Sequence, residues 1–172
     1  RMPDYPLIKP LEQLPEKTHV FPQGIQAPPR PGTRRPGPPR LLWTARWEHD
    51  KNPELFFEAL RRLRDEGCDF RLSVLGERFS DVPEVFETAR VLLHDRIDRW
   101  GYLSERAEYW RTLSEADLVV STARHEFFGV GIVEAAAAGV YPVLPERLSY
   151  PEIFGTERDV FYDGSLNHLV ER

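Results

Sequence analysis

Short apolar runs rich in β-branched and aromatic residues alternate with longer stretches of helical periodicity from residue 40 to the end of the chain. Runs of this kind, bounded by glycine, proline or polar residues, are typical of buried strands. They predict strands at 41–45, 70–76, 96–100, 118–122, 140–144 and 160–162, of which 96–100 has the weakest pattern. Strands that alternate with helices predict a Rossmann-like α/β fold, in which a parallel sheet is covered by helices on both faces.

The helices between these strands are predicted from their caps and from their apolar spacing. The best defined helix follows the first strand, where Asp50 or Asn52 can act as the cap. Pro53 lies in its first turn and Gly67 ends it. Its apolar residues recur at helical spacing and predict one buried face: Leu55, Phe56, Ala59, Leu60 and Leu63. Further helices are predicted to begin at Pro83 and Ser165, and Ser104 is the predicted cap of the helix that holds Tyr109, Trp110 and Leu113.

Residues 1–39 are rich in proline and have no periodic apolar pattern, which predicts a linker. Its basic cluster comprises Arg30, Arg34 and Arg35 and extends to Arg40. This cluster could contact RNA, but a solvated loop is the simpler interpretation. Residues 40–172 are therefore predicted to form a single domain, which is long enough for a core of its own.

Charge and cysteine content narrow the class of protein. The 172-residue chain has a formal net charge of −5, which argues against a large nucleic-acid-binding surface on this chain alone. Cys68 is the single cysteine, which excludes an internal disulfide and favours a reducing compartment. No apolar run is long enough to cross a membrane, and none follows Arg1-Met2 as a secretion signal would require. We therefore expect a cytoplasmic protein without a membrane partner.

Two glutamates, Glu126 and Glu134, follow the strand at 118–122 and are separated by seven residues. Glycines lie between them and an alanine run closed by Gly139 follows, which places the second glutamate about one turn into a helix. Unpaired N–H groups and the positive end of the helix dipole make such a helix start a natural phosphate site. The two carboxylates can therefore meet the two ends of a phosphate-bearing ligand.

This Glu-x7-Glu spacing before a small-residue helix resembles the signature of retaining GT-B glycosyltransferases, the family that includes sucrose and trehalose-phosphate synthases. Three blocks in order, Arg46–Pro53, His125–Gly129 and Tyr150–Phe154, resemble its tRNA-queuosine mannosyltransferase branch. The resemblance covers roughly residues 18 to 163. It implies that 40–172 is the C-terminal, nucleotide-sugar-binding half of a GT-B fold. It also implies that 1–39 is an interdomain linker and that the N-terminal acceptor domain is absent from this chain.

The resemblance assigns roles to residues that follow the first three strands. Two cations, Arg46 and Lys51, would stabilise the negative charge that develops on a leaving nucleoside diphosphate, as at matching family positions. Without the resemblance, they would be side chains of a solvated loop. Gly76 would allow close approach of the nucleotide, and Gly101–Tyr102–Leu103 would meet its base. An ordinary turn at Gly76 and a core position for Tyr102 are the alternatives.

The remaining roles fall on the Glu-x7-Glu motif. Glu134 would accept hydrogen bonds from the two ribose hydroxyls, because a carboxylate offers two acceptor oxygens to a vicinal diol. An exposed helix glutamate is the alternative, although the helix is too apolar for a typical surface helix. Glu126 would hold the donor sugar and stabilise positive charge at its anomeric carbon. Three residues would offer backbone N–H groups to sugar or phosphate: Phe128, Gly129 and Val130.

Two further residues near the first glutamate affect the sugar site. His125 is a candidate general base or sugar ligand, and a structural histidine is the alternative. The sequence departs from the common family pattern at Phe127, where a glycine usually follows the first glutamate. A phenylalanine there would narrow the sugar pocket or change its hydrogen bonding, so the identity of the sugar cannot be carried over from the wider family.

The function that the resemblance implies is donor binding in a retaining glycosyltransferase that moves mannose from GDP-mannose to queuosine in a tRNA anticodon. The tRNA would be bound mainly by the absent domain, so this chain alone should bind nucleotide without transferring sugar. The family resembled needs no metal and the sequence has no paired metal-ligand set, so we expect no cofactor. The alternatives are another donor, such as a UDP-sugar with a glycan or lipid acceptor, and a non-catalytic nucleotide-binding module.

Overall fold

The computed structural model describes residues 36–79, 81–155 and 158–172, together with residues 15, 18, 19, 21, 23–26 and 28. Most of the predicted linker lies outside the described residues, including the basic residues Arg30, Arg34 and Arg35. The described chain from Pro36 onward forms the α/β unit that carries the candidate site.

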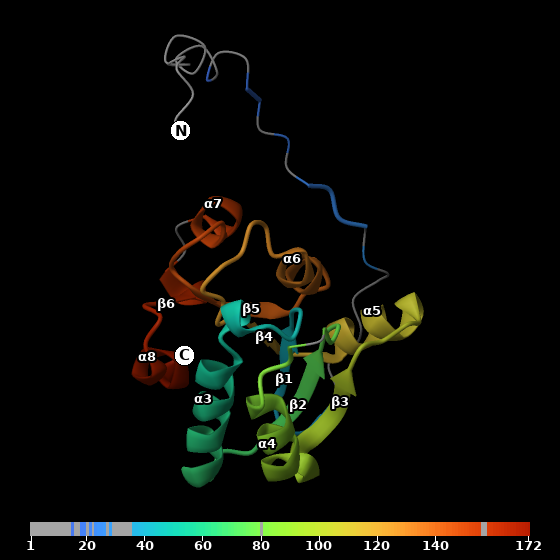
Figure 1. Cartoon of the computed structure of the whole chain (residues 1–172), viewed down its shortest axis with the longest axis vertical. Helices are drawn as coiled ribbons and strands as arrows, with labels where there is room; N and C mark the ends of the chain where they lie inside the picture. The colour runs from blue at the N-terminus through green and yellow to red at the C-terminus, as the bar shows by residue number, and fades with distance from the viewer. Residues whose placement is uncertain are drawn as a thin grey trace, which may run out of the picture.

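Parallel strands form one sheet in the order β3-β2-β1-β4-β5-β6 (Figure 1). The strands are β1 (Arg40–Thr44), β2 (Arg71–Leu75), β3 (Ile97–Gly101), β4 (Leu118–Val120), β5 (Tyr141–Pro145) and β6 (Phe161–Tyr162). Each predicted strand is present, with small shifts at its ends. The predicted Rossmann-like α/β fold is confirmed.

Helices cover both faces of the sheet (Figure 1). One apolar core lies beneath α3 (Pro53–Asp65), α4 (Val85–Leu92) and α8 (Leu166–Glu171). The other core lies beneath α5 (Arg106–Glu115), α6 (Val130–Ala137) and α7 (Tyr150–Phe154). Short 3-10 helices span His49–Lys51, His94–Arg96 and Arg158–Val160. Leu42 and Trp43 belong to different cores because successive strand side chains point to opposite faces.

The helix caps differ from the sequence predictions at two places. Asn52 does precede α3, but its backbone is left-handed (φ 50°) and its side chain makes no capping hydrogen bond. The prediction of Ser104 as a cap is wrong, since α5 begins at Arg106 and Glu105 occupies the cap position. The prediction of Ser165 is confirmed, because its hydroxyl accepts a hydrogen bond from the amide of His168 at 3.2 Å.

The neighbouring strands β1 and β4 send the chain to opposite faces of the sheet. The helix after β1 is α3, which packs on the first core, whereas the helix after β4 is α6, which packs on the second. Leu41 pairs with Leu118 and Leu42 with Val119 across the two strands. A crevice opens outside the carboxyl ends of strands at such a switch point, where ligands bind in open α/β sheets.

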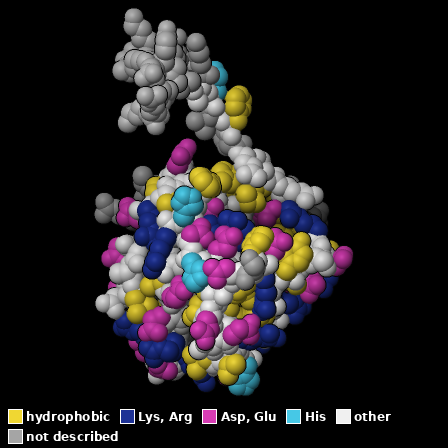
Figure 2. All heavy atoms as spheres, viewed as in Figure 1, with side chains coloured by type: hydrophobic (Ala, Val, Ile, Leu, Met, Phe, Trp, Pro, Cys, Tyr) yellow, Lys and Arg dark blue, Asp and Glu magenta, His cyan; other side chains and the backbone are white. Residues whose placement is uncertain are grey.

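The surface mixes charges of both signs. On the face seen in Figure 2, acidic side chains lie among lysines and arginines instead of leaving one continuous basic field. Large exposed apolar side chains include Tyr102 and Phe127, which lie on loops that follow β3 and β4. Among the helices that the described residues form, none is both long enough and apolar enough to cross a membrane.

Candidate functional site

A cleft of about 290 Å³ lies at the carboxyl ends of β1 and β4. The end of β1 contributes Thr44, Ala45 and Arg46 to its wall, and the 3-10 helix that follows contributes Lys51. The opposite wall comprises residues 120–123 and 126–132, which lead into the first turn of α6, with Tyr150 of α7. The cleft is therefore at the topological switch point, where the parallel-sheet rule places a ligand.

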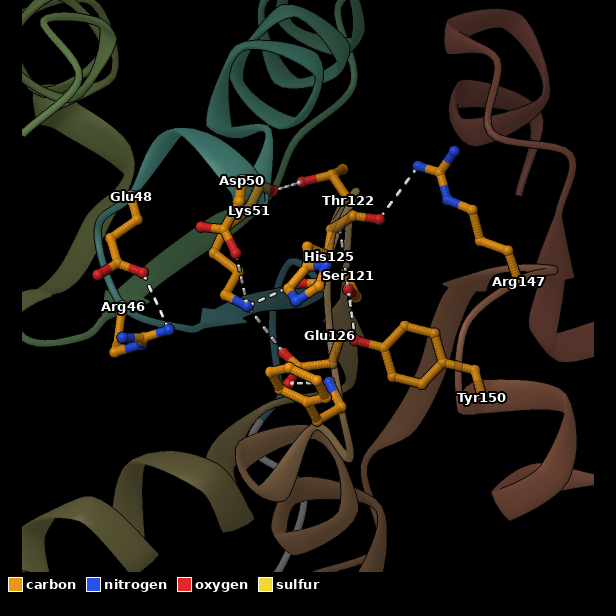
Figure 3. Close-up of polar contacts among 12 residues, drawn as sticks. Arg46, Glu48, Asp50, Lys51, Ser121, Thr122, His125, Glu126, Arg147 and Tyr150 are labelled. Carbon is orange, nitrogen blue, oxygen red and sulfur yellow. Dashed lines mark hydrogen bonds and ion pairs between the residues drawn. The ribbon is translucent and has the colours of Figure 1, made fainter. Parts of the chain in front are cut away.

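Lys51 puts a buried positive charge in the wall of this cleft, and Figure 3 shows its contacts with Asp50, His125 and Glu126. Its residue is only 5% exposed. Its Nζ lies 3.3 Å from Glu126 Oε2 and 3.2 Å from Asp50 Oδ2, and it donates to the carbonyl of His125 at 2.7 Å. A buried ammonium is costly unless it is paired and hydrogen-bonded. The carboxylates and the carbonyl meet that requirement and hold the ammonium in one place.

The loop after β4 is fastened to the 3-10 helix that carries Lys51. The carbonyl of Asp50 accepts hydrogen bonds from the amides of Arg124 at 2.8 Å and His125 at 3.3 Å. The hydroxyl of Thr122 donates to the carbonyl of Lys51 at 2.9 Å. These contacts join segments more than 70 residues apart in sequence, so the two walls of the cleft form one unit.

Glu126 is held through both carboxylate oxygens. Oε2 faces Lys51, and Oε1 accepts a hydrogen bond from the amide of Phe127 at 3.1 Å. The ring of Phe127 is 84% exposed and meets the ring of His125 edge-on, with centroids 4.8 Å apart. Phe127 therefore lines the mouth of the cleft without filling its interior.

The first turn of α6 forms the floor beside these charges. Gly129 precedes the helix with φ 76°, and a Cβ on it would lie 3.0 Å from the ring of Tyr150. The Tyr150 hydroxyl is 2.8 Å from Ser121 Oγ, which fixes the ring under the glycine. Gly131 packs against Thr44 of β1, where a Cβ would lie 3.0 Å from the hydroxyl. The glycines thus bring the unpaired N–H groups of the helix start close to the strand ends.

Arg46 adds a second cation at the rim. Its side chain is 55% exposed, and Nη2 lies 3.0 Å from Glu48 Oε2 (Figure 3). An exposed ion pair of this kind contributes little in water. Glu48 can therefore release Arg46 to a more strongly charged anion in the cleft.

The sequence model of the family described as "Glycosyl transferases group 1" matches residues 27–167. The chain belongs to this family. The match covers most of the chain, including the segments that carry Arg46, Lys51, Glu126 and Glu134.

Curated relatives of this glycosyl transferase chain include mannosyltransferases. It is 46% identical over 117 residues to the tRNA-queuosine alpha-mannosyltransferase of Drosophila melanogaster, covering 68% of this chain and 31% of the relative. It is 29% identical over 133 residues to a GDP-mannose-dependent alpha-(1-6)-phosphatidylinositol dimannoside mannosyltransferase of Mycobacterium tuberculosis, covering 76% and 34%. The chain spans about a third of the length of the curated relatives that it matches.

Solved glycosyltransferase structures share its fold. The catalytic domain of cholesterol-alpha-glucosyltransferase from Helicobacter pylori superposes with a TM-score of 0.61 at 18% identity, covering 78% of this chain and 83% of that chain. Sucrose-phosphate synthase from Thermosynechococcus elongatus gives 0.63 at 19% identity, covering 78% and 35%. The predicted GT-B relationship is confirmed at the level of fold.

The structure brings half of the predicted site residues of this glycosyl transferase together. Those lining the cleft are Arg46, Lys51, Glu126, Phe128, Gly129 and Val130. The other predicted residues do not line it within the described chain: Gly76, Gly101, Tyr102, Leu103, His125 and Glu134. Their assignments as nucleotide contacts stay predictions.

The residues outside the cleft have distinct surroundings. Gly76 closely approaches the chain's own backbone, since a Cβ there would lie 1.8 Å from the carbonyl oxygen of Ala45. Tyr102 is 69% exposed, so the alternative of a core aromatic is wrong. Leu103 packs against the second core, and His125 presents its carbonyl to Lys51 while its ring stays on the surface.

Sequence reasoning missed several residues that support the site. Thr44, Ser121 and Tyr150 line the cleft. Thr44 ends β1 and Ser121 follows β4, which was the available signal, whereas Tyr150 begins α7. Arg106 and Tyr109 of α5 hydrogen-bond to Glu134. Their spacing of three residues places both on one helix face, but no local pattern shows which element that face meets.

Buried tyrosines around the site make stability sensitive to alkaline pH. Burial raises the pKa of Tyr109, Tyr150 and Tyr162 well above the ordinary range, and the carboxylates of Glu134 and Glu126 raise the first two further. The hydroxyls stay protonated in the folded chain, whereas in the unfolded chain they ionise near pH 10. The free energy of unfolding should therefore be unaffected by these groups below about pH 10 and fall as the pH rises above it.

Urea unfolding between pH 8 and 11.5 checks this prediction. Tyr150→Phe should flatten the alkaline decline, because it removes one ionising hydroxyl from the unfolded state. Tyr102→Phe is the matched control, since that ring is exposed, and it should leave the slope unchanged. If the free energy of unfolding falls equally steeply with pH in the two variants, the raised pKa of Tyr150 does not cause the alkaline decline.

Proposed function

We propose that this chain is the donor-binding part of a retaining glycosyltransferase that transfers mannose from GDP-mannose to queuosine in a tRNA anticodon. The observation that carries the proposal is the buried Lys51 ammonium, 3.3 Å from Glu126 beside the first turn of α6. A cation, a carboxylate and a helix start suit the parts of a nucleotide sugar: an anionic diphosphate and a hydroxylated ring.

The chemistry would divide among these groups. Cleavage of the bond from the anomeric carbon to the diphosphate leaves negative charge on the departing GDP. Lys51, Arg46 and the N–H groups at the start of α6 would stabilise that charge. Glu126 would accept hydrogen bonds from the sugar and face the positive charge developing at the anomeric carbon. Because Lys51 and Arg46 would stabilise the negative charge of the diphosphate, we propose that donor binding needs no metal.

The identities of the donor and the acceptor are proposed from the names of two relatives. One relative's name specifies tRNA-queuosine and alpha-mannosyl transfer, and the other's specifies GDP-mannose dependence. Since the chain spans about a third of those proteins, the acceptor would be bound mainly by the rest of the full-length enzyme. This chain alone would then bind the donor without transferring it, and a tRNA acceptor would place the reaction in the cytoplasm.

Thermal unfolding of this chain with GDP, UDP or ADP, in buffer containing EDTA, tests the proposal. GDP at about 100 times its dissociation constant should add about 2.7 kcal/mol to the free energy of unfolding. GDP-mannose should act likewise, and Arg61→Met, far along α3, should not reduce the effect. A preference for UDP would overturn the mannose donor but keep the class of enzyme. Failure of any nucleotide to stabilise the full-length protein would favour a module without donor binding.

A further inference from the structure

The carboxylate of Glu134 is buried and held by two residues of the neighbouring helix α5. Arg106 Nη2 donates to Oε1 at 2.6 Å, and the Tyr109 hydroxyl donates to Oε2 at 2.6 Å. Glu134 is 5% exposed, although it lies on a helix that is otherwise made of small and apolar residues. Each of its two oxygens therefore has one fixed donor.

The two donors are themselves fixed. The Arg106 guanidinium lies over the rings of Tyr109, at 5.2 Å, and Trp110, at 4.9 Å. Tyr109 meets Trp110 edge-on with centroids 5.7 Å apart. The Arg106 side chain is still 51% exposed, so the pair with Glu134 lies at the protein surface and is not sealed in the core.

This cluster adjoins the cleft through β1. Thr44 lines the cleft, and its hydroxyl is near enough to the Tyr109 hydroxyl to oppose the rise in the pKa of that tyrosine. Thr44 also contacts Gly131, in the turn of α6 before Glu134. A chain of contacts thus runs from the cleft wall through Thr44 and Tyr109 to the carboxylate.

The Glu134 carboxylate has more hydrogen-bond acceptor positions than Arg106 and Tyr109 occupy. An ionised carboxylate has about four lone-pair positions. Arg106 and Tyr109 occupy one on each oxygen, which leaves one on each oxygen for a further donor. Two hydroxyls on adjacent carbons match two free acceptor positions on adjacent oxygens.

We propose that Arg106 and Tyr109 are positioning residues that orient Glu134 to bind the vicinal ribose hydroxyls of the donor nucleotide. The ribose contact of Glu134 is the one that the family resemblance implies. The inference rests on the proposed donor site and adds the two residues that hold the carboxylate for that contact. A purely structural role for the Arg106–Glu134 ion pair is less well supported. Burying the two charges offsets most of their attraction, so the pair would add little to the stability of the fold.

Isothermal titration of this chain with GDP and with 2′,3′-dideoxy-GDP tests the inference. Each hydrogen bond to the carboxylate is worth roughly tenfold in affinity or more, so the unsubstituted chain should prefer GDP by about a hundredfold. Tyr109→Phe and Arg106→Met should each reduce that preference about tenfold, as loss of an orienting partner does at metal sites. The affinity of each variant for dideoxy-GDP should stay within about twofold of the affinity of the unsubstituted chain. Arg111→Met is the matched control, since Arg111 is exposed on the same helix.

The outcomes separate the inference from the proposed function. A fall in affinity for GDP but not for dideoxy-GDP, in both variants, supports the positioning role. Equal losses for the two ligands, or no loss, overturn it, because the residues would then act elsewhere on the nucleotide or only on the fold. No preference for GDP in the unsubstituted chain overturns the role of Glu134 itself. Absence of binding to both nucleotides in the unsubstituted chain overturns the donor site and this inference together.

Discussion

Lys51→Met is expected to weaken the binding of GDP to this chain by about a hundredfold, measured by isothermal titration. The ammonium is the buried cation of the cleft, and it lies between Asp50 and Glu126. Its removal would take away the positive charge beside the proposed diphosphate site and leave the two carboxylates to repel the diphosphate. In the full-length enzyme the same substitution should lower kcat/KM with GDP-mannose by roughly 10²–10³-fold, because the lost interaction stabilises developing charge.

A double substitution separates binding from stability. Lys51→Met alone should also lower the free energy of unfolding, since it strands two partly buried carboxylates. Adding Glu126→Gln removes one of these charges and should restore part of the stability, but it should not restore GDP affinity. If the double variant regains normal GDP binding, Lys51 serves only to neutralise Glu126. Arg46→Met should have a smaller effect than Lys51→Met, because Arg46 is half exposed and screened by solvent.

The parts of the site that were predictable from sequence are those encoded locally. The apolar runs and the glycine-bounded helix after β4 are short-range patterns, and the parallel-sheet rule then places Lys51 and Glu126 at the same edge. The sequence therefore placed both residues at one edge of the sheet, but the pairing of β1 with β4 that brings them into contact was not predicted. The 3.3 Å contact that the structure shows joins residues 75 positions apart, and its predicted catalytic role still awaits the titrations.

The surroundings of Glu134 were not predictable in the same way. The motif indicated a ribose ligand, whereas the structure shows a buried carboxylate that is already hydrogen-bonded by Arg106 and Tyr109. These partners lie 28 and 25 residues earlier, on another helix. Helical periodicity shows which residues share a face, but the packing of α5 against α6 decides what that face meets.

Gly76 shows how one residue type allows two interpretations. A glycine after a strand indicates close approach of some backbone or ligand, and the family resemblance favoured the nucleotide. In the structure the close neighbours are Ala45 and Trp47 of the segment after β1. The glycine is needed for that contact whether or not a nucleotide also lies nearby.

Gly76→Ala is accordingly expected to lower the free energy of unfolding by about 4 kcal/mol. The residue has φ 155°, and the added Cβ would lie 1.8 Å from the Ala45 carbonyl oxygen and 2.7 Å from Trp47 Cδ1. Neither neighbour can move easily. The Ala45 amide is hydrogen-bonded to Leu75 at 3.2 Å, and the fully buried Trp47 is stacked on Phe86 with centroids 4.2 Å apart. Urea unfolding should show a lower midpoint at an unchanged m-value.

Gly67→Ala is the matched control for this substitution. Gly67 also has a positive φ, 81°, but a Cβ there would meet nothing within 4 Å. Its cost should be the backbone strain alone, about 1–2 kcal/mol. The difference between the two variants then measures the clash with Ala45 and Trp47. Equal destabilisation would mean that the strand ends can separate to admit a methyl group, and the walls of the cleft would be more mobile than their contacts indicate.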